Sequence, residues 1–199
     1  PVCSSAASDV YKRQVHRDFR KPLVLMTPKS LLRNKLCTSK IEDFTNGSSF
    51  HRVLWDDAEK GSSSTELAKD KNIRRVVMCS GKVYFDLLEE RDARGLNDIY
   101  LLRFEQFYPF PAMSALKELE RFQNAEMVWC QEEPKNQGAW SFMEPNIEWV
   151  LSRMKAKFKR PIYVGRPASA SPATGLASQH KEQQKLLVEE ALNLKENKK

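Results

Sequence analysis

The sequence predicts an α/β fold, in which a mostly parallel five-stranded sheet lies between two layers of helices as a three-layer α/β/α sandwich. Two observations predict it: short apolar runs alternate with longer amphipathic segments along the 199 residues, and each run is apolar throughout. Strands that are apolar on both faces are typical of parallel sheets covered by helices, which right-handed crossovers connect. The 41% of hydrophobic and 10% of aromatic residues exclude a disordered chain.

Five strand-and-helix units follow one another along the chain. The first joins the run KPLVLMT at 21–27 to the periodic segment KSLLRNKL at 29–36. The later strands are expected at 73–80, 98–106, 125–133 and 160–167, and the helical segments that follow them at 82–95, at 109–122, from Pro134 to Met154, and at 181–194.

Glycine and proline mark the boundaries of these elements. Gly81 and Gly95 bracket the second helical segment, and Pro111 stands at the start of the third, where its missing N–H does no harm. Pro145 falls inside the fourth segment and should break or kink it, because proline removes a helical hydrogen bond and crowds the preceding turn.

One α/β domain is expected over 15–194, with less regular sequence around and within it. Residues 1–14 are small, polar and aperiodic, and we interpret them as a disordered or foreign leader. The polar, Ser-rich stretch 56–71 is expected to form an exposed and mobile loop, and the tail 195–199 is expected to fray.

The net charge and the cysteines indicate which partners, sites and cell compartment to expect. The net charge of +7 allows an anionic partner, although a solvated basic surface explains it more simply. The four cysteines contain no CxxC pair, which argues against zinc or thioredoxin-like sites, and Cys79 and Cys130 lie in apolar runs typical of buried thiols. We therefore expect a reducing compartment. A helix needs about 20 consecutive apolar residues to span a bilayer, and no apolar stretch approaches that length, so we expect no membrane partner.

Two strand-to-helix junctions carry groups that could bind an anion. In CSGK at 79–82, the N–H groups of the turn and the ammonium of Lys82 could face a phosphate, but a tight turn with Ser80 as N-cap is an equally good interpretation. The segment also lacks the spaced glycines of a P-loop or dinucleotide fold. In TPKSLLR at 27–33, a solvated basic helix face is the alternative to an anion site made by Thr27, Lys29, Ser30 and Arg33.

Carboxylates gather where the predicted strands end. Glu132 and Glu133 end the fourth strand, and consecutive strand residues point to opposite faces, so the two cannot act as an acid and base on one substrate. With Glu105 they mark the sheet edge where ligands and interfaces lie in α/β folds. The alternative is that they cap helices and pair with Arg103 or Lys135. The sequence has no Ser-His-Asp arrangement, HExxH or metal-ligand cluster, and we assign no catalytic, cofactor-binding or metal-binding residue.

Five segments together resemble one family. They are RKPLVLMTPKSLLR at 20–33, RRVVMCSGKVYFDLLEER at 74–91, LLRFEQFYPFP at 101–111, VWCQEEPKNQGAW at 128–140 and GRPASASPATG at 165–175. Over roughly 15–194, the chain is similar to the C-terminal domain of the thiamine-diphosphate-dependent subunit of the 2-oxoglutarate dehydrogenase complex. That domain is similar to the C-terminal domain of transketolases, whereas residues 1–14 resemble nothing in the family.

The resemblance implies an oxidoreductase subunit of a multienzyme complex in the citric acid cycle. Such a subunit decarboxylates 2-oxoglutarate on thiamine diphosphate with Mg²⁺ and passes the succinyl group to lipoyl groups of the dihydrolipoyl succinyltransferase subunit. The family's cofactor-binding domains lie upstream of the matching region, so we expect no bound cofactor and no independent activity here. It further implies a homodimer in the bacterial cytoplasm or mitochondrial matrix. In some relatives a coenzyme A thioester regulates the enzyme through this region, which would supply the anion for the candidates above.

As a C-terminal domain, the chain is expected to supply dimer contacts and to support neighbouring domains. Gly138 should allow a close backbone approach or an unusual dihedral angle, and Trp140 should anchor packing or an interface. The full set of expected structural or interface residues is Gly81, Glu132, Glu133, Asn136, Gln137, Gly138 and Trp140. An independent nucleotide- or anion-binding α/β module is the alternative function. The basic segment 153–160 has one interleaved aromatic residue and no recognised module, so we expect no nucleic-acid partner.

Overall fold

The computed structural model describes residues 26–45, 47–61 and 63–193, and the single positions 18, 22 and 24. The chain divides into two compact units, one up to His51 and one from Arg52 onward. Our expectations for the leader 1–14 and the tail 195–199 lie outside the described residues. A single domain over 15–194 stays a prediction.

The described part of the first unit holds two short 3₁₀ helices, η2 (Lys29–Arg33) and η3 (Ile41–Phe44), and neither has a buried residue. The prediction of a strand at 21–27 is wrong at the positions that the structure describes, because none of them is in a strand. Val24 and Met26 are 77% and 92% exposed. The helix expected over 29–36 is limited to η2 and ends at Arg33. An apolar run becomes a buried strand only where a neighbouring strand pairs with it, and the described part of this unit offers none.

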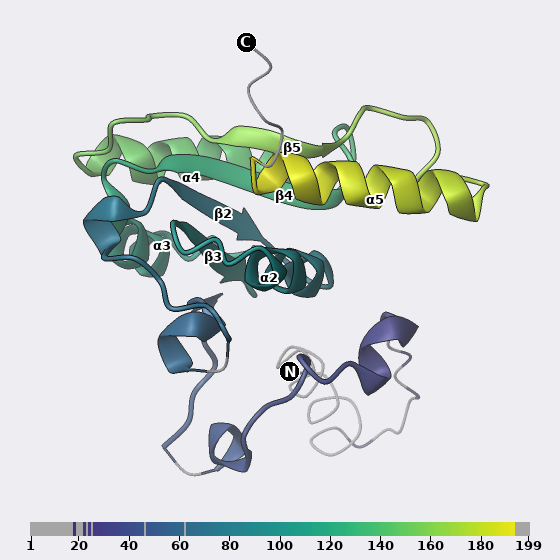
Figure 1. The fold of residues 1–199 in the computed structure, drawn as a ribbon, viewed down its shortest axis with the longest axis horizontal. Coiled ribbons are helices and arrows are strands. Elements are labelled where there is room, and N and C mark those ends of the chain that lie inside the picture. Colours follow the sequence, from purple (N-terminus) through teal and green to yellow (C-terminus); the bar gives the residue numbers. More distant parts are fainter. Residues whose placement is uncertain are drawn as a thin grey trace. The chain divides into compact units, whose positions relative to one another are not determined.

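The second unit is built on a five-stranded sheet with the order β1-β3-β2-β4-β5 (Figure 1). Strands β2 (Arg75–Cys79), β3 (Ile99–Phe104), β4 (Glu126–Pro134) and β5 (Ile162–Arg166) are parallel, and β1 (Val53–Leu54) pairs antiparallel with β3. The predicted mostly parallel five-stranded sheet is confirmed, with β1 in place of the strand expected at 21–27. Because β1 has only two residues, it pairs with only part of the edge of β3.

Four helices connect and cover the strands: α2 (Val83–Ala93), α3 (Ala112–Leu119), α4 (Trp140–Arg153) and α5 (Ala177–Ala191). Helix α3 packs against α4, and α2 packs against α5, so that each pair covers one face of the sheet (Figure 1). The predicted three-layer sandwich is therefore confirmed. Gly81 and Gly95 flank α2 with φ angles of 74° and 61°, and Pro111 occupies the N-cap of α3, as the punctuation predicted.

Helix α4 continues through Pro145, so the break predicted there is wrong. Proline costs the helix one hydrogen bond, but the apolar face of α4 outweighs that loss. Met143, Ile147 and Val150 are fully buried on both sides of the proline. Tertiary packing thus holds together a helix that its local sequence would interrupt.

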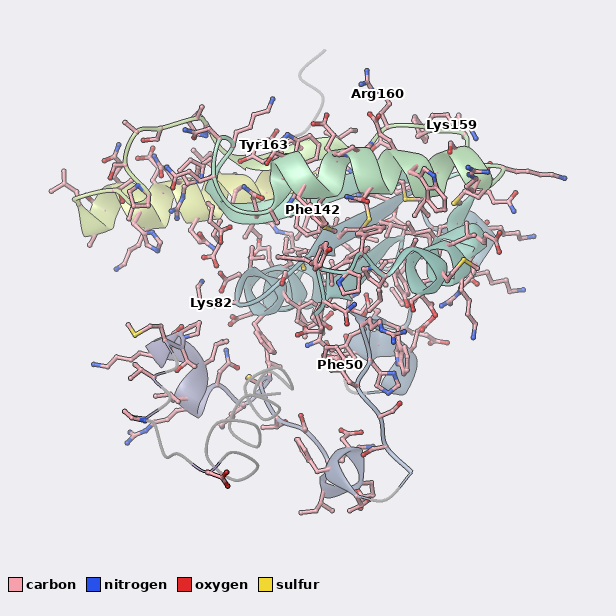
Figure 2. The ribbon with its side chains drawn as sticks, turned by 180° about the vertical axis from the view of Figure 1, so that it is seen from behind. Phe50, Lys82, Phe142, Lys159, Arg160 and Tyr163 are labelled. Atoms are coloured by element: carbon pink, nitrogen blue, oxygen red, sulfur yellow. The ribbon has the colours of Figure 1, made fainter. Side chains whose placement is uncertain are left out.

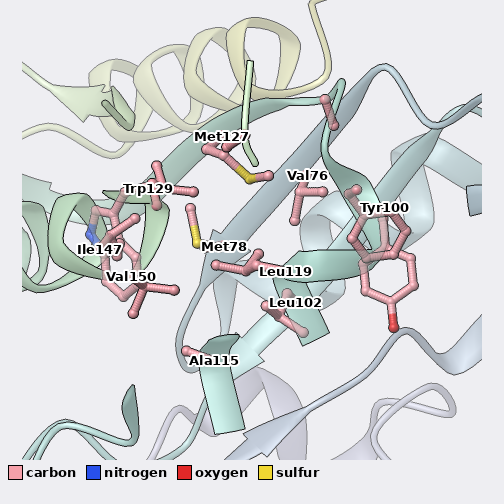
Figure 3. Packing of buried hydrophobic residues seen from close by; sticks show 14 of the residues in the cluster. Val76, Met78, Tyr100, Leu102, Ala115, Leu119, Met127, Trp129, Ile147 and Val150 are labelled. Atoms are coloured by element: carbon pink, nitrogen blue, oxygen red, sulfur yellow. The ribbon is translucent and has the colours of Figure 1, made fainter. Parts of the chain in front are cut away.

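Alternate residues of each strand separate into two cores. Val76 and Met78 of β2 join Trp129 and residues of α3 and α4 in one cluster, which Figure 3 shows. The intervening residues face α2 and α5, and among them Cys79 and Cys130 are free, fully buried and in register on neighbouring strands. Burial raises the pKa of Cys79 to about 12 and that of Cys130 well above its usual value. Both thiols are small core residues, as predicted.

The connection 56–71 is only partly the exposed loop that we expected. It contains the 3₁₀ helix η4 (Asp57–Lys60) and buries Asp56 and Thr65, which are 0% and 8% exposed. Asp56 pairs with Arg91 of α2, and the Thr65 hydroxyl donates to Asp92 at 2.8 Å. The polar residues that suggested a solvated loop therefore include those that fasten it to α2.

Candidate functional site

Gln131 organises the turn between β4 and α4 at the carboxyl-end edge of the sheet. This side chain is buried, and its Oε1 accepts hydrogen bonds from Trp129 Nε1 and the Trp140 backbone N–H, both at 3.0 Å. Its Nε2 donates to three carbonyl oxygens of the turn, those of Glu133 and Pro134 at 3.2 Å and of Gln137 at 2.8 Å. One buried amide therefore satisfies polar groups on both sides of the turn and fixes its shape.

Gly138 is required by this turn for two reasons. Its φ angle is 66°, in the left-handed region that favours glycine. A Cβ atom added there would lie 2.9 Å from Glu133 Cβ, which is too close, and 3.0 Å from Gln131 Nε2, which is tighter than most contacts. The expectation of a close backbone approach or an unusual dihedral angle is confirmed in both respects.

Asn136 and Gln137 connect this turn to the loop between β5 and α5. The Asn136 side chain donates to the Ser169 carbonyl oxygen and accepts from the Ser169 N–H, both at 3.0 Å. Gln137 Nε2 donates to the same carbonyl oxygen at 3.1 Å. Both amides are therefore engaged in joining two loops of the same sheet edge.

Trp140 is an anchor inside the domain. Its side chain is buried, and its ring lies 5.2 Å from the ring of Tyr163 on β5. The Tyr163 hydroxyl donates to the Arg166 carbonyl oxygen at 2.8 Å, and a Cβ atom on Gly165 would lie only 2.5 Å from that hydroxyl. The indole therefore packs between β5 and the turn.

The two carboxylates that end β4 contact different neighbours, as the alternation of strand side chains predicts. Glu132 forms an ion pair with Lys82 at 2.9 Å, at the start of α2. Glu133 is exposed, and its Cβ lies against the turn at Gly138. For Glu132, the alternative that the strand-end carboxylates pair with Arg103 or Lys135 is wrong, because β2 lies between β3 and β4 and brings Lys82 nearer. Arg103 instead lies 3.4 Å from Asp57.

Lys82 is held between two carboxylates, those of Glu132 and Asp86, each at 2.9 Å. Burial alone would lower the pKa of Lys82, but the hydrogen bonds to these two carboxylates outweigh it and raise the pKa. Lys82 also occupies the N-cap of α2 without a side-chain cap, so the interpretation of Ser80 as N-cap is wrong. The ammonium is therefore already paired with carboxylates of the protein.

Arg166 extends this polar cluster, and the sequence analysis missed it. The side chain is 9% exposed; its Nη2 lies 2.9 Å from His180 Nδ1 and donates to Gln184 Oε1 at 3.2 Å. Gln184 in turn donates to Asp86 at 2.7 Å. Only the strand-end position of Arg166 could have suggested it, because the sequence does not show that His180 and Gln184, one turn apart on the following helix α5, face the end of β5.

The remaining anion candidates lie in the first unit, whereas Lys82 belongs to the second. Thr27, Lys29, Ser30 and Arg33 are all exposed. Their role as a regulator site stays a prediction.

The described edge is suited to holding loops in place. In the part of the chain that the structure describes, no group of three or more His, Cys, Asp or Glu side chains is placed to hold a metal ion. No described helix has the length and hydropathy needed to cross a membrane. The side chains at the edge bond to backbone groups of neighbouring loops and to one another, and Figure 2 shows Lys82 and Tyr163 among them.

Comparison with known proteins identifies the family. Residues 38–192 match the family model described as 2-oxoglutarate dehydrogenase C-terminal. The chain is 59% identical over 184 residues to the 2-oxoglutarate dehydrogenase E1 components of Brucella anthropi, Brucella ovis and Brucella abortus. These matches cover 92% of this chain but only 18% of each relative. The chain therefore belongs to the 2-oxoglutarate dehydrogenase C-terminal family.

Proposed function

We propose that this chain acts as the C-terminal part of a 2-oxoglutarate dehydrogenase E1 component, the oxidoreductase that decarboxylates 2-oxoglutarate in the citric acid cycle and transfers the succinyl group to lipoyl groups. The observation that carries the proposal is the 59% identity to E1 components over 92% of the chain. The alternative of an independent anion-binding module is not favoured, because Lys82 is already paired with two carboxylates.

Within that enzyme, we assign the domain a structural role. The residues expected to matter at the sheet edge are engaged in fixing its loops: Gln137 and Asn136 hold Ser169, and Gly138 fits the turn. Thiamine diphosphate and Mg²⁺ supply the decarboxylation chemistry of the whole E1 component. The described residues do not fit these groups, since they present no metal-ligand cluster, and we derive no catalytic step from this chain.

The partners proposed for the domain are the upstream domains of the same subunit, a second E1 subunit and the dihydrolipoyl succinyltransferase. The exposed Thr27, Lys29, Ser30 and Arg33 are the proposed contacts for an anionic regulator such as a coenzyme A thioester. We place the enzyme in the bacterial cytoplasm or the mitochondrial matrix, in keeping with its buried free thiols.

A chimera tests the proposed function. The upstream part of the Brucella anthropi E1 component would be joined to this chain at residue 15, and decarboxylation of 2-oxoglutarate would be followed with ferricyanide as electron acceptor. We expect activity within about tenfold of the parent enzyme, since the replaced region supplies support and not chemistry. A chimera that folds, by circular dichroism and sedimentation, but remains inactive would overturn the proposal.

A further inference from the structure

An apolar patch lies on the second unit where α3 and α4 begin. It consists of Tyr108, Phe110, Met113 and Phe142, and we call it the edge patch. Tyr108, Met113 and Phe142 are 84%, 72% and 38% exposed, and Phe110 is half-buried. Met113 and Phe142 each lie in the first turn of helices that pack against each other, and Figure 2 shows Phe142 at that end of α4.

Two residues of the edge patch, Phe110 and Phe142, belong to a continuous series of aromatic rings that reaches the core. Between ring centroids, Phe142 lies 6.4 Å from Phe110, and Phe110 lies 5.9 Å from Phe104. The Phe104 centroid lies 6.0 Å from that of the buried Trp129. Rings supported in this way hold their positions before any partner binds, so docking costs little side-chain entropy. Scattered apolar residues are ordinary on a protein surface, whereas adjoining rigid aromatic rings mark an interface.

The path of the chain indicates what covers the patch. The family match is C-terminal and spans 18% of the relatives, so most of an E1 chain lies upstream of this domain. The second unit is entered at Arg52, whose carbonyl oxygen accepts hydrogen bonds from the Glu105 and Gln106 N–H groups at 3.0 and 3.2 Å. These two residues open the loop that carries Tyr108 and Phe110. The chain therefore enters the second unit beside the loop that carries Tyr108 and Phe110.

We propose that the edge patch is the surface on which the upstream domains of the same E1 chain dock. This inference rests on the proposed function and adds to it the face of the domain and the kind of partner. The partner surface is apolar, because Tyr108, Phe110, Met113 and Phe142 present aromatic and thioether groups and no charge. A second copy of the chain is the competing occupant, and the test below separates the two.

Thiol labelling of the chimera measures whether the patch is covered. Met113→Cys would be compared with Leu186→Cys, a control on α5, on the opposite face of the sheet, where Leu186 is 44% exposed. Both variants would carry Cys37→Ser, and maleimide incorporation would be read by mass spectrometry of the labelled peptide and normalised to the rate in urea. We expect position 113 to react at least about tenfold more slowly than position 186. Equal rates would overturn the inference.

Cross-linking identifies the occupant. A photoreactive benzoylphenylalanine in place of Tyr108 would be irradiated in the same chimera. We expect a product of single-chain mass, linked to a peptide upstream of this domain. A product of double-chain mass would show that a second copy covers the patch and would overturn the inference. A chimera that decarboxylates 2-oxoglutarate but labels position 113 freely defeats this inference alone, whereas a folded and inactive chimera defeats the proposed function.

Discussion

Two buried polar side chains, Asp56 and Gln131, each fasten a connection to the sheet, but one is charged and the other neutral. The Asp56 carboxylate accepts from the N–H groups of Leu101 at 2.7 Å and Ala58 at 2.9 Å, and from Arg91 Nη1. Its bond to Leu101 covers part of the β3 edge that the two-residue β1 does not reach. Gln131 makes its hydrogen bonds to backbone groups and one indole, without any ion.

The difference decides how each connection would fail. Removing a buried neutral amide leaves its hydrogen-bond partners unsatisfied, and each unsatisfied group lowers the free energy of unfolding by about 1–3 kcal/mol. A carboxylate that loses its guanidinium remains a buried charge, which costs about 3–5 kcal/mol. Hence the connection before β2 should depend on one ion pair, and the turn after β4 on several weaker bonds.

The largest effect is expected at the ion pair. Arg91→Met leaves the fully buried Asp56 without its cation and should destabilise the fold by about 3–5 kcal/mol, measured by urea unfolding. Arg94→Met is the matched control, since Arg94 is on the surface beside the same helix, and the loss there should stay below about 1 kcal/mol. Equal losses for the two variants would contradict the assigned role of Asp56.

Gln131→Leu should come next. It removes both acceptor bonds and the donors to three carbonyl oxygens, and we expect a loss of about 3 kcal/mol because several buried groups lose their partners together. The same unfolding measurement applies, with Gln137→Ala as control, which should cost less than about 1 kcal/mol. A loss at Gln131 no greater than at Gln137 would show that the turn holds without it.

How much of this the sequence predicted depended on whether a feature was local. Continuous apolar runs identified the four parallel strands, because burial on both faces leaves that pattern. The run at 21–27 looked the same and failed, since apolar sequence does not reveal whether a neighbouring strand exists. Gly138 was predictable because its constraint lies in the turn itself.

The site partners could not be read from the sequence, because they depend on strand order. Glu132 meets Lys82 only because β2 and β4 are neighbours, and Asn136 meets Ser169 only because β4 and β5 are. Gln131 did leave a signal, as a polar residue directly after the apolar run of β4. Its function as a hub became clear only from the path of the turn around it.

Gly138→Ala should have a smaller effect. Comparing it with Gly95→Ala separates the cost of backbone strain from the cost of a steric clash. At Gly95, φ is 61° and an added Cβ would meet nothing within 4 Å, so Gly95→Ala should cost only the backbone strain of about 1 kcal/mol. Gly138→Ala adds a clash with Glu133 and Gln131 and should cost about 2–3 kcal/mol. Equal thermal unfolding temperatures for the two variants would mean that the turn relieves the clash at no cost and only the backbone strain remains.

The smallest expected effect is on the stability of the fold at low pH. Burial opposes ionisation of Asp92, but hydrogen bonds from Ser63 and Thr65 and the charge of Arg91 outweigh it and hold its pKa below the ordinary value of 3.8. The folded state thus binds this proton less readily than the unfolded state. Its contribution to stability is present above about pH 4 and disappears as the pH falls through the lowered pKa. In Asp92→Asn, the free energy of unfolding measured in urea should fall less steeply between about pH 5 and pH 3. An unchanged dependence on pH would contradict this role of Asp92.

The central claim is that the two carboxylates ending β4 take no part in chemistry, and that Glu132 supports the fold through Lys82. The direct test is kcat for 2-oxoglutarate decarboxylation by the chimera carrying Glu132→Gln and Glu133→Gln, which keeps the shape of both side chains. We predict a kcat within about threefold of the unsubstituted chimera, because neither group would act on substrate. A loss of about a hundredfold or more at unchanged stability, the size expected for a missing general acid or base, would contradict the account.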